Sequence, residues 1–298
     1  MLGDIESLGA GNGQKGILTH GFVNDLQTIQ SQCMGLAGGV PVSGNFAIET
    51  VGLTKRYSES VLAYEDLSIQ ITDGEFCVFV GKSGCGKTSL LRAFAGLNPP
   101  SSGDLVVDGV SVYGKKYEAL PRVAGRVGFV FQEANLLPWR TVAQNICLPL
   151  EASGAVRGAE ARVKELADLV GLEKFLDAFP SQLSGGMRQR VSLARALICE
   201  PRLILMDEPF GALDAITRES MNLLLEKVWQ ASAATVVLVT HSISEAVLLA
   251  DRIIVMTPHP GRIKTTYRIE EPRPRGSAWL AKPEAVALSA QIKQDLGG

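Results

Sequence analysis

Apolar and polar positions along this chain form two kinds of pattern, one typical of buried strands and one of half-exposed strands. Four short apolar runs, in EFCVFVG, RVGFVFQE, RLILMDEP and TVVLVTHS, end in glycine or polar residues, as parallel strands buried on both faces do. We expect these runs to form a central parallel sheet. The segments FAIETVGLTKRY and VLAYEDLSIQIT alternate as half-exposed strands do, and Asp108-Gly109 predicts a hairpin. The pattern indicates an α/β fold with an antiparallel β subdomain.

A helical period lies between the second and third apolar runs. Apolar residues recur at helical spacing in ARVKELADLVGL, at Val163, Leu166, Leu169 and Val170. We therefore predict an inserted α-helical subdomain over about residues 137–185. After the last run, RIIVMTPHPGRIKTTYRI predicts a further hairpin that turns at Pro260-Gly261.

Composition divides the chain into three parts. The first part is Gly-rich and weakly patterned, and we interpret it as an extension. In the last part Pro, Arg, Lys and Gly dominate, and we expect it to be partly ordered at best. The parts are the extension, residues 1–45, the main domain, residues 46–270, and the tail, residues 271–298.

Charge, hydropathy and cysteine usage exclude several classes of protein. The 29 basic and 31 acidic side chains nearly balance, which gives no electrostatic footprint for nucleic acid. No apolar run approaches the roughly 18 residues of a membrane-spanning helix, and no basic start with an apolar core indicates a secretory signal. The five cysteines form no CxxC pair, so we expect reduced thiols in a cytosolic protein, without a disulfide framework or a zinc site.

A phosphate loop follows the first apolar run. The stretch GKSGCGKT has the spacing GxxxxGK followed by Ser or Thr, between a predicted strand and the helical TSLLRAFAGL. Glycines let backbone N–H groups turn toward a phosphate, Lys87 supplies a cation, and the Thr88 hydroxyl is a ligand for Mg²⁺. Cys85 lies inside the loop, where we expect a reactive thiol whose alkylation abolishes nucleotide hydrolysis. The nucleotide-binding residues expected here are Gly81, Lys82, Ser83, Gly84, Cys85, Gly86, Lys87, Thr88 and Ser89.

Two acids end the third apolar run. The segment RLILMDE terminates in Asp207 and Glu208, and ligands bind at the carboxyl ends of strands in α/β sheets. Asp207 suits Mg²⁺, and Glu208 can polarise a water molecule against the γ phosphate as a general base. An isolated acid pair is more often a helix cap or a solvated turn. Its conjunction with the phosphate loop favours the catalytic interpretation.

Five motifs, in this order along the chain, resemble those of the ATP-binding subunits of ABC transporters. Besides the phosphate loop and the two acids, they are Gln132 in VFQEANLLPW, the signature LSGGM at residues 183–187, and His241 in LVTHSISEA. The resemblance covers about residues 48–263. It implies a P-loop NTPase core that binds and hydrolyses ATP with Mg²⁺.

The resemblance also implies roles for single residues. Gln132 is expected to sense Mg²⁺ and the attacking water, and His241 to contact the γ phosphate as a switch. Tyr57 resembles the aromatic residue that stacks on adenine, offering a flat apolar face. A strand tyrosine usually packs in a core, however, and Tyr64 is an alternative for the stacking role.

Two further motifs imply a pair of subunits. Ser184 can cap a helix that continues to Leu197, leaving the N–H groups of Gly185 and Gly186 to face an anion. In the family this signature covers the γ phosphate held by a second subunit, and the segment with Asp214 resembles the loop that crosses to that subunit. We therefore expect a head-to-tail ATPase dimer, of two copies or of this chain and a close paralogue, around two ATP molecules.

Finer resemblance indicates one branch of the family. The stretches LLPWRTVAQNICLPL, MDEPFGALDAITR and PHPGRI resemble ATPases of importers for nitrate, sulfonate, taurine and similar small solutes. Such a subunit is a peripheral protein on the cytoplasmic face of the cell membrane. Its partners are an integral membrane permease and, indirectly, an extracytoplasmic solute-binding protein, but no nucleic acid. Ser242 departs from the family, in which aspartate usually follows the histidine.

Two other classes of protein are alternatives. ABC-type ATPases that act on DNA or ribosomes share similar signatures, but they carry long heptad helices or two cassettes on one chain. This chain has one cassette without sustained heptads between Gln132 and Ser184. A P-loop kinase or transferase leaves Gln132, the signature and His241 unexplained. We therefore favour a transport ATPase.

Overall fold

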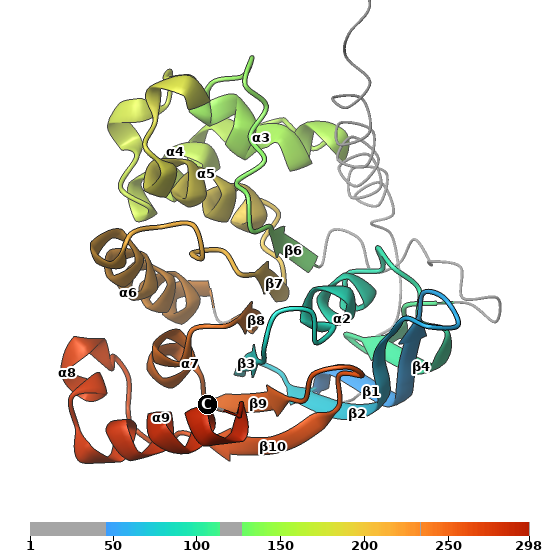
Figure 1. Cartoon of the computed structure of the whole chain (residues 1–298). Helices are drawn as coiled ribbons and strands as arrows, with labels where there is room; N and C mark the ends of the chain where they lie inside the picture. The colour runs from blue at the N-terminus through green and yellow to red at the C-terminus, as the bar shows by residue number, and fades with distance from the viewer. Residues whose placement is uncertain (1–45, 114–126, 233, 298) are drawn as a thin grey trace, which may run out of the picture.

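A six-stranded sheet forms the centre of the computed structural model, which describes residues 46–113, 127–232 and 234–297 (Figure 1). The predicted extension, residues 1–45, lies outside these described residues. The strand order is β10-β9-β3-β8-β7-β6. The strands are β3 (Phe76–Val80), β6 (Val127–Val130), β7 (Leu203–Asp207), β8 (Thr235–Thr240), β9 (Arg252–Met256) and β10 (Ile263–Arg268).

Parallel pairing joins the four apolar runs, as predicted. β3 pairs with β8, β8 with β7, and β7 with β6, all in parallel. The sheet is wider than expected, because β9 pairs in parallel with β3 on its other side and β10 is antiparallel to β9. β9 contains the same kind of continuous apolar run, which is buried from Ile253 to Met256. The hairpin predicted at Pro260-Gly261 is confirmed, and both of its strands belong to the central sheet.

Helices cover both faces of the central sheet, which therefore has two separate cores. The helices are α2 (Lys87–Phe94) on one face, and α5 (Gly185–Leu197), α6 (Ala215–Ser232) and α7 (Ile243–Leu249) on the other (Figure 1). Phe76, Val78 and Val80 pack on the side of α5, α6 and α7. Cys77 and Phe79, which alternate with them, pack on the side of α2. Because both faces are covered, polar functional groups of this sheet belong at its strand ends.

An antiparallel sheet packs beside α2, as the alternating segments predict. Its order within the described residues is β2-β1-β4-β5. Asp108 and Gly109 connect β4 to β5 with φ angles of 49° and 71°, the positive values that a two-residue hairpin turn of this sequence requires. The hairpin predicted at this dipeptide is confirmed. The strands are β1 (Phe46–Arg56), β2 (Leu62–Thr72), β4 (Ser102–Val107) and β5 (Val110–Ser111).

Helices occupy the segment between residues 137 and 185. They are α3 (Val142–Ala152), α4 (Ala159–Leu169) and the short 3₁₀ turns η3 (Glu173–Phe175) and η4 (Pro180–Gln182). Val163, Leu166 and Val170 are buried, whereas Leu169 lies on the outer face of α4 and is exposed. None of the helices in the described ranges has the length and apolar character needed to cross a membrane.

The described tail residues, 271–297, form helices α8 (Gly276–Leu280) and α9 (Pro283–Asp295), so the prediction of a partly ordered tail is wrong. Trp279, Ala285 and Ile292 are buried in the core on the α7 side of the sheet. The Trp279 indole N–H also donates to Val247 O at 2.9 Å. A few well-spaced apolar residues anchor the tail, although it contains no long apolar run.

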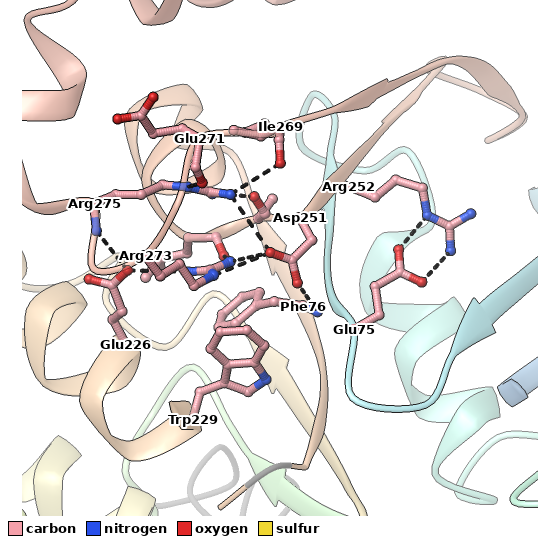
Figure 2. Close-up of polar contacts among 12 residues, drawn as sticks. Glu75, Phe76, Glu226, Trp229, Asp251, Arg252, Ile269, Glu271, Arg273 and Arg275 are labelled. Atoms are coloured by element: carbon pink, nitrogen blue, oxygen red, sulfur yellow. Dashed lines mark hydrogen bonds and ion pairs between the residues drawn. The ribbon is translucent and has the colours of Figure 1, made fainter. Parts of the chain in front are cut away.

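Two arginines of the tail enter a polar cluster between α6, α7 and β3 (Figure 2). The Arg273 guanidinium pairs with Asp251 at 2.7 Å and with Glu226 at 3.4 Å, and it lies 4.3 Å from the centre of the Trp229 ring. Arg275 is buried, and burial lowers its pKa to about 10, so it stays charged at neutral pH. It donates to carbonyl oxygens at the end of α7, which have no partner within the helix. The tail therefore caps α7.

Replacing Arg273 by Met should lower the free energy of unfolding by about 3 kcal/mol, because the buried Glu226 carboxylate loses its cation. Urea unfolding followed by circular dichroism measures the loss. Lys282→Met is the matched control, since the Lys282–Glu271 pair is more exposed and its removal should cost less than about 1 kcal/mol. Equal losses in the two variants would show that the cluster stabilises the fold no more than a surface pair does.

Candidate functional site

Three of the predicted motifs meet at one edge of the central sheet. Parallel register pairs Val80, at the end of β3, with Thr240 of β8, and it pairs Asp207, at the end of β7, with Val239 of β8. The phosphate loop follows β3, the candidate general base follows β7, and the candidate histidine follows β8. The register therefore brings three segments that are far apart in the sequence to the same place.

The phosphate loop turns tightly between β3 and α2. Gly86 has a φ of 90°, and a Cβ there would lie 2.4 Å from the carbonyl oxygen of Ala63, so only glycine fits. The buried Lys87 ammonium donates to Gly81 O at 2.8 Å and to Lys82 O at 3.1 Å. Lys87 and the N-terminus of α2 together give the loop the positive potential that phosphate binding requires.

A hydrogen bond connects the phosphate loop with the first of the two acids. Thr88 Oγ1 donates to Asp207 Oδ1 at 2.8 Å. Burial raises the pKa of Asp207, and the hydrogen bond from Thr88 opposes this shift. Two oxygen ligands held together beside a phosphate loop fit Mg²⁺, which takes one or two protein oxygens and completes its shell with phosphate and water.

Glu208 and His241 form a second polar pair. Glu208 Oε2 lies 2.9 Å from His241 Nδ1, and 53% of the His241 side chain is exposed. The φ of Glu208 is 44°, an uncommon value for a residue with a side chain. Its N–H donates to Val239 O at 2.9 Å, which fixes the residue at the sheet edge. The pair therefore presents a carboxylate that is oriented by an imidazole, as a general base for water requires.

A cleft of about 400 Å³ is bordered by Tyr57 and by six of the nine residues predicted for the phosphate loop, 81–89. Asp207 and His241 adjoin it through Thr88 and Glu208. Lys87, Glu208 and Gln132 thus border the same space, where the resemblance implies that the γ phosphate and the attacking water lie. The residues around the cleft include Tyr57, Ser83, Gly84, Gly86, Lys87, Thr88, Ser89, Gln132, Glu208 and His259.

The structure distinguishes the two candidate aromatic residues. Tyr57 borders the cleft and is 54% exposed. Its hydroxyl accepts a hydrogen bond from Asn98 Nδ2 at 2.6 Å and lies 3.0 Å from Ser89 Oγ. Tyr64 is fully buried, and burial raises the pKa of its hydroxyl. Tyr57 thus presents an exposed ring at the cleft, with the Lys55 ammonium 4.9 Å from the ring centre, whereas Tyr64 belongs to the core.

Cys85 does not present its thiol to the cleft. The residue is fully buried, and its Sγ lies 3.7 Å from Lys87 Nζ. A Cβ on Gly81 would lie 2.5 Å from the same sulfur, so the sulfur fills the space beneath the loop. Burial argues against the expected reactive thiol, because a reagent cannot reach this sulfur in the folded loop, whereas the effect of alkylation on hydrolysis stays a prediction. Cys85 can contact a phosphate through its backbone only.

The signature and Asp214 lie outside the cleft that the described residues form. Ser184 caps α5 as predicted, accepting a backbone N–H of the first turn at 3.2 Å. A Cβ on Gly185 would lie 3.7 Å from Leu213, which places the signature against the loop that carries Asp214. Asp214 caps α6 by accepting the Thr217 N–H at 3.0 Å, and this hydrogen bond lowers its pKa. In the described part of the chain, the signature and the phosphate loop therefore lie on separate surfaces.

Sequence reasoning missed His259, which lies in the turn between β9 and β10 and borders the cleft. A Cβ on Gly84 would lie 3.3 Å from the His259 ring, so the imidazole sits against the phosphate loop. The Gly261 N–H donates to Ala63 O at 3.0 Å and holds the turn in this place. The segment PHPG predicts a turn, but only the packing of that turn on β2 brings its histidine to the cleft.

Comparison with known proteins gives one consistent result. A family profile described as ABC transporter matches residues 64–211. The taurine import ATP-binding protein TauB of Rhizobium johnstonii is 44% identical over 222 residues, which are 74% of this chain and 82% of that protein. The aliphatic sulfonates import ATP-binding protein SsuB 1 of Mesorhizobium japonicum is 41% identical over 249 residues, which are 84% of this chain and 90% of that protein.

Solved structures agree with these matches. The dimeric ATP-binding cassette MJ0796, in a post-hydrolysis state bound to ADP and phosphate, is 33% identical with a TM-score of 0.65. The match covers 75% of this chain and 99% of that one. The cbiO1 protein of Clostridium perfringens, part of an ABC transporter complex, gives a TM-score of 0.67 at 24% identity over 84% of this chain and 97% of that one, a likeness of fold.

Replacing Tyr57 by Ala should weaken ATP binding about tenfold, because an aromatic ring stacked on a base contributes about 1–3 kcal/mol. Isothermal titration measures the affinity. Tyr57→Phe keeps the ring and should retain the affinity, and Tyr64→Phe is the control for loss of a tyrosine hydroxyl in the core. If Tyr57→Ala bound ATP as tightly as the parent, Tyr57 would not stack on the base.

Proposed function

The chain belongs to the ABC transporter family of ATP-binding subunits, and on this premise we propose that it couples ATP hydrolysis to the import of a small solute. The protein is an ATPase. One observation carries the proposal: the phosphate loop, both strand-end acids, Gln132 and His241 gather around one cleft. The names of the taurine and aliphatic sulfonate importers support a small sulfonate, or a similar solute such as nitrate, as the cargo.

ATP lies, in this proposal, with its adenine against Tyr57 and its phosphates in the phosphate loop. Loop N–H groups and Lys87 bind the β and γ phosphates. Thr88 and Asp207 are the ligands for Mg²⁺, and Gln132 borders the same space. When bound, the metal ion neutralises charge on the phosphates.

Glu208 is the proposed general base. Its carboxylate accepts a proton from the water that attacks the γ phosphate, and the products are ADP and inorganic phosphate. His241, 2.9 Å from this carboxylate, holds it in position and contacts the γ phosphate. The distance between His241 and Glu208, and their position at the same edge of the central sheet, support a joint role of the two side chains at the γ phosphate.

Two subunits complete two ATP sites. The signature residues Ser184, Gly185 and Gly186 do not border the cleft formed by the described residues of their own chain, so we assign them to the γ phosphate held by a second subunit. The first-turn N–H groups and the dipole of α5 suit such an anion. ATP then joins the subunits head to tail, and hydrolysis lets them separate. The dimeric form of the cassette MJ0796 supports this arrangement.

The helical segment offers a surface for a membrane permease. Trp139, Phe175 and Phe179 are exposed aromatic residues of this segment. Their two stretches lie side by side, because the Val142 N–H donates to Ala178 O at 2.9 Å. Gathered exposed apolar residues mark interaction sites. In this proposal the subunit is a peripheral protein at the cytoplasmic face of the membrane, and a solute-binding protein acts on it only through the permease.

The alternative of an ATPase that acts on nucleic acid or ribosomes has less support. Acidic and basic residues nearly balance, as 31 against 29, which provides no general attraction to phosphate backbones. The named relatives are import subunits.

Replacing Glu208 by Gln should lower ATP turnover about 100-fold or more while ATP still binds, because the amide cannot accept the proton of the attacking water. Phosphate release measures turnover, and size-exclusion chromatography with ATP should show a trapped dimer. Glu219→Gln, at an exposed position of α6, is the control and should leave both properties unchanged. Turnover equal to that of the parent would exclude Glu208 as the base.

A further inference from the structure

Arg218, in the first turn of α6, binds the loop that connects β7 to α6. Its Nε donates to Phe210 O at 3.2 Å, and its Nη2 donates to Leu213 O at 2.8 Å and to Gly211 O at 3.5 Å. A guanidinium suits this task because its donors are fixed in one plane. Ala212 and Asp214, in the same loop, are exposed. Phe210 is buried and Leu213 packs against the core, and these hydrogen bonds fix the backbone of the loop between them.

The same guanidinium faces a buried carboxylate on α7. Arg218 Nε lies 3.7 Å from Glu245 Oε1, and only 3% of the Glu245 side chain is exposed. Burial raises the pKa of Glu245, and the hydrogen bond from Thr240 and the charge of Arg218 oppose this shift. A hydrogen-bond donor and a cation thus face the buried carboxyl group of Glu245.

Glu245 in turn fixes the backbone on both sides of His241. The Thr240 hydroxyl donates to Glu245 Oε2 at 2.6 Å and accepts the Ser242 N–H at 3.0 Å. Ser242 Oγ accepts the Glu245 N–H at 3.3 Å and caps α7. Ser242, which stands where the family usually has aspartate, therefore performs the capping role with its hydroxyl. His241 lies between two residues that are both held by Glu245.

The contacts form a closed ring. Glu208 O accepts the Gly211 N–H at 3.1 Å, Arg218 binds Gly211 and Glu245, and Glu245 holds the His241 segment. His241 Nδ1 lies 2.9 Å from Glu208 Oε2, and this contact closes the ring. Every member is joined to the next by a hydrogen bond, an ion pair or the chain itself.

We propose that Arg218 and Glu245 are positioning residues, which hold His241 against Glu208 and at the same time fix the loop that carries Asp214. The inference rests on the proposed function, in which Glu208 is the base and the Asp214 loop faces a second subunit. A movement of that loop on dimer contact is then transmitted through Arg218 and Glu245 to His241. Neither residue borders the cleft that the described residues form, so their loss should lower turnover and leave nucleotide binding unchanged.

Replacing Arg218 by Met should lower kcat about tenfold or more with little change in the ATP dissociation constant, because small displacements of catalytic groups cost large factors in rate. Arg218→Lys keeps the charge near Glu245 but lacks the planar set of donors, so it should recover part of the lost kcat. Arg162→Met is the matched control. Arg162 is an arginine of α4 with an acidic partner and similar exposure, 30% against 32% for Arg218, and its loss should not change kcat.

A chemical readout separates a positioning role from a general loss of stability. Diethyl pyrocarbonate modifies exposed imidazoles, and mass spectrometry resolves the rate at His241 from the rate at His259. In Arg218→Met and in the isosteric Glu245→Gln, the rate at His241 should rise several-fold while the rate at His259 stays constant. Unchanged modification of His241 together with parental kcat would overturn the inference.

A double-mutant cycle tests the connection between the two residues. If Arg218 and Glu245 act through one ring, the pair Arg218→Met and Glu245→Gln should lower kcat no more than the worse single change does. If the factors by which the two single changes lower kcat multiplied in the double variant, the two residues would act independently, which would contradict the inference. Failure of the proposed function is recognised separately, because Glu208→Gln would then hydrolyse ATP like the parent, whatever the Arg218 variants do.

Discussion

Parallel pairing of β3, β8 and β7 is the constraint on which the site depends. The register pairs Val80 with Thr240 and Val239 with Asp207, so the segments that follow these strands start at one edge of the sheet. Both sheet faces are covered by apolar layers, and polar groups therefore gather beyond the last ladder hydrogen bond. The same backbone ladder reaches Glu208, whose N–H donates to Val239 O, so the ladder also holds the general base candidate at the edge of the sheet.

Close packing then fixes the phosphate loop relative to that edge. A Cβ on Gly86 would approach Ala63 O to 2.4 Å, and one on Gly261 would approach Cys85 O to 2.1 Å. The loop is thus enclosed by β2 on one side and by the β9–β10 turn on another, without room for a side chain at either contact. This enclosure explains why His259 reaches the cleft, and why the Cys85 sulfur is hidden beneath the loop.

Local sequence signals predicted the strands, the phosphate loop and the Ser184 cap because each depends on a few adjacent residues. The remaining features depend on partners that are distant in the sequence. The arginines of the tail resemble a solvated segment by composition, yet Arg273 is held by Glu226 and Asp251 of other elements. The inward orientation of the Cys85 side chain depends on tertiary packing beneath the loop, which the spacing of residues in the motif does not predict. β9 has the apolar run of a central strand, but its place beside β3 is decided by sheet topology.

Among the described residues, the phosphate loop and the signature do not share a cleft. The central claim follows from this separation: each ATP site is built from two subunits. Mixing Lys87→Ala subunits with Ser184→Arg subunits and measuring ATP hydrolysis tests it most directly. Each variant alone lacks one half of both sites and should be inactive, whereas the mixed dimer contains one intact site, so hydrolysis should reappear on mixing. Persistent inactivity of the mixture, or full hydrolysis by Ser184→Arg alone, would contradict the account.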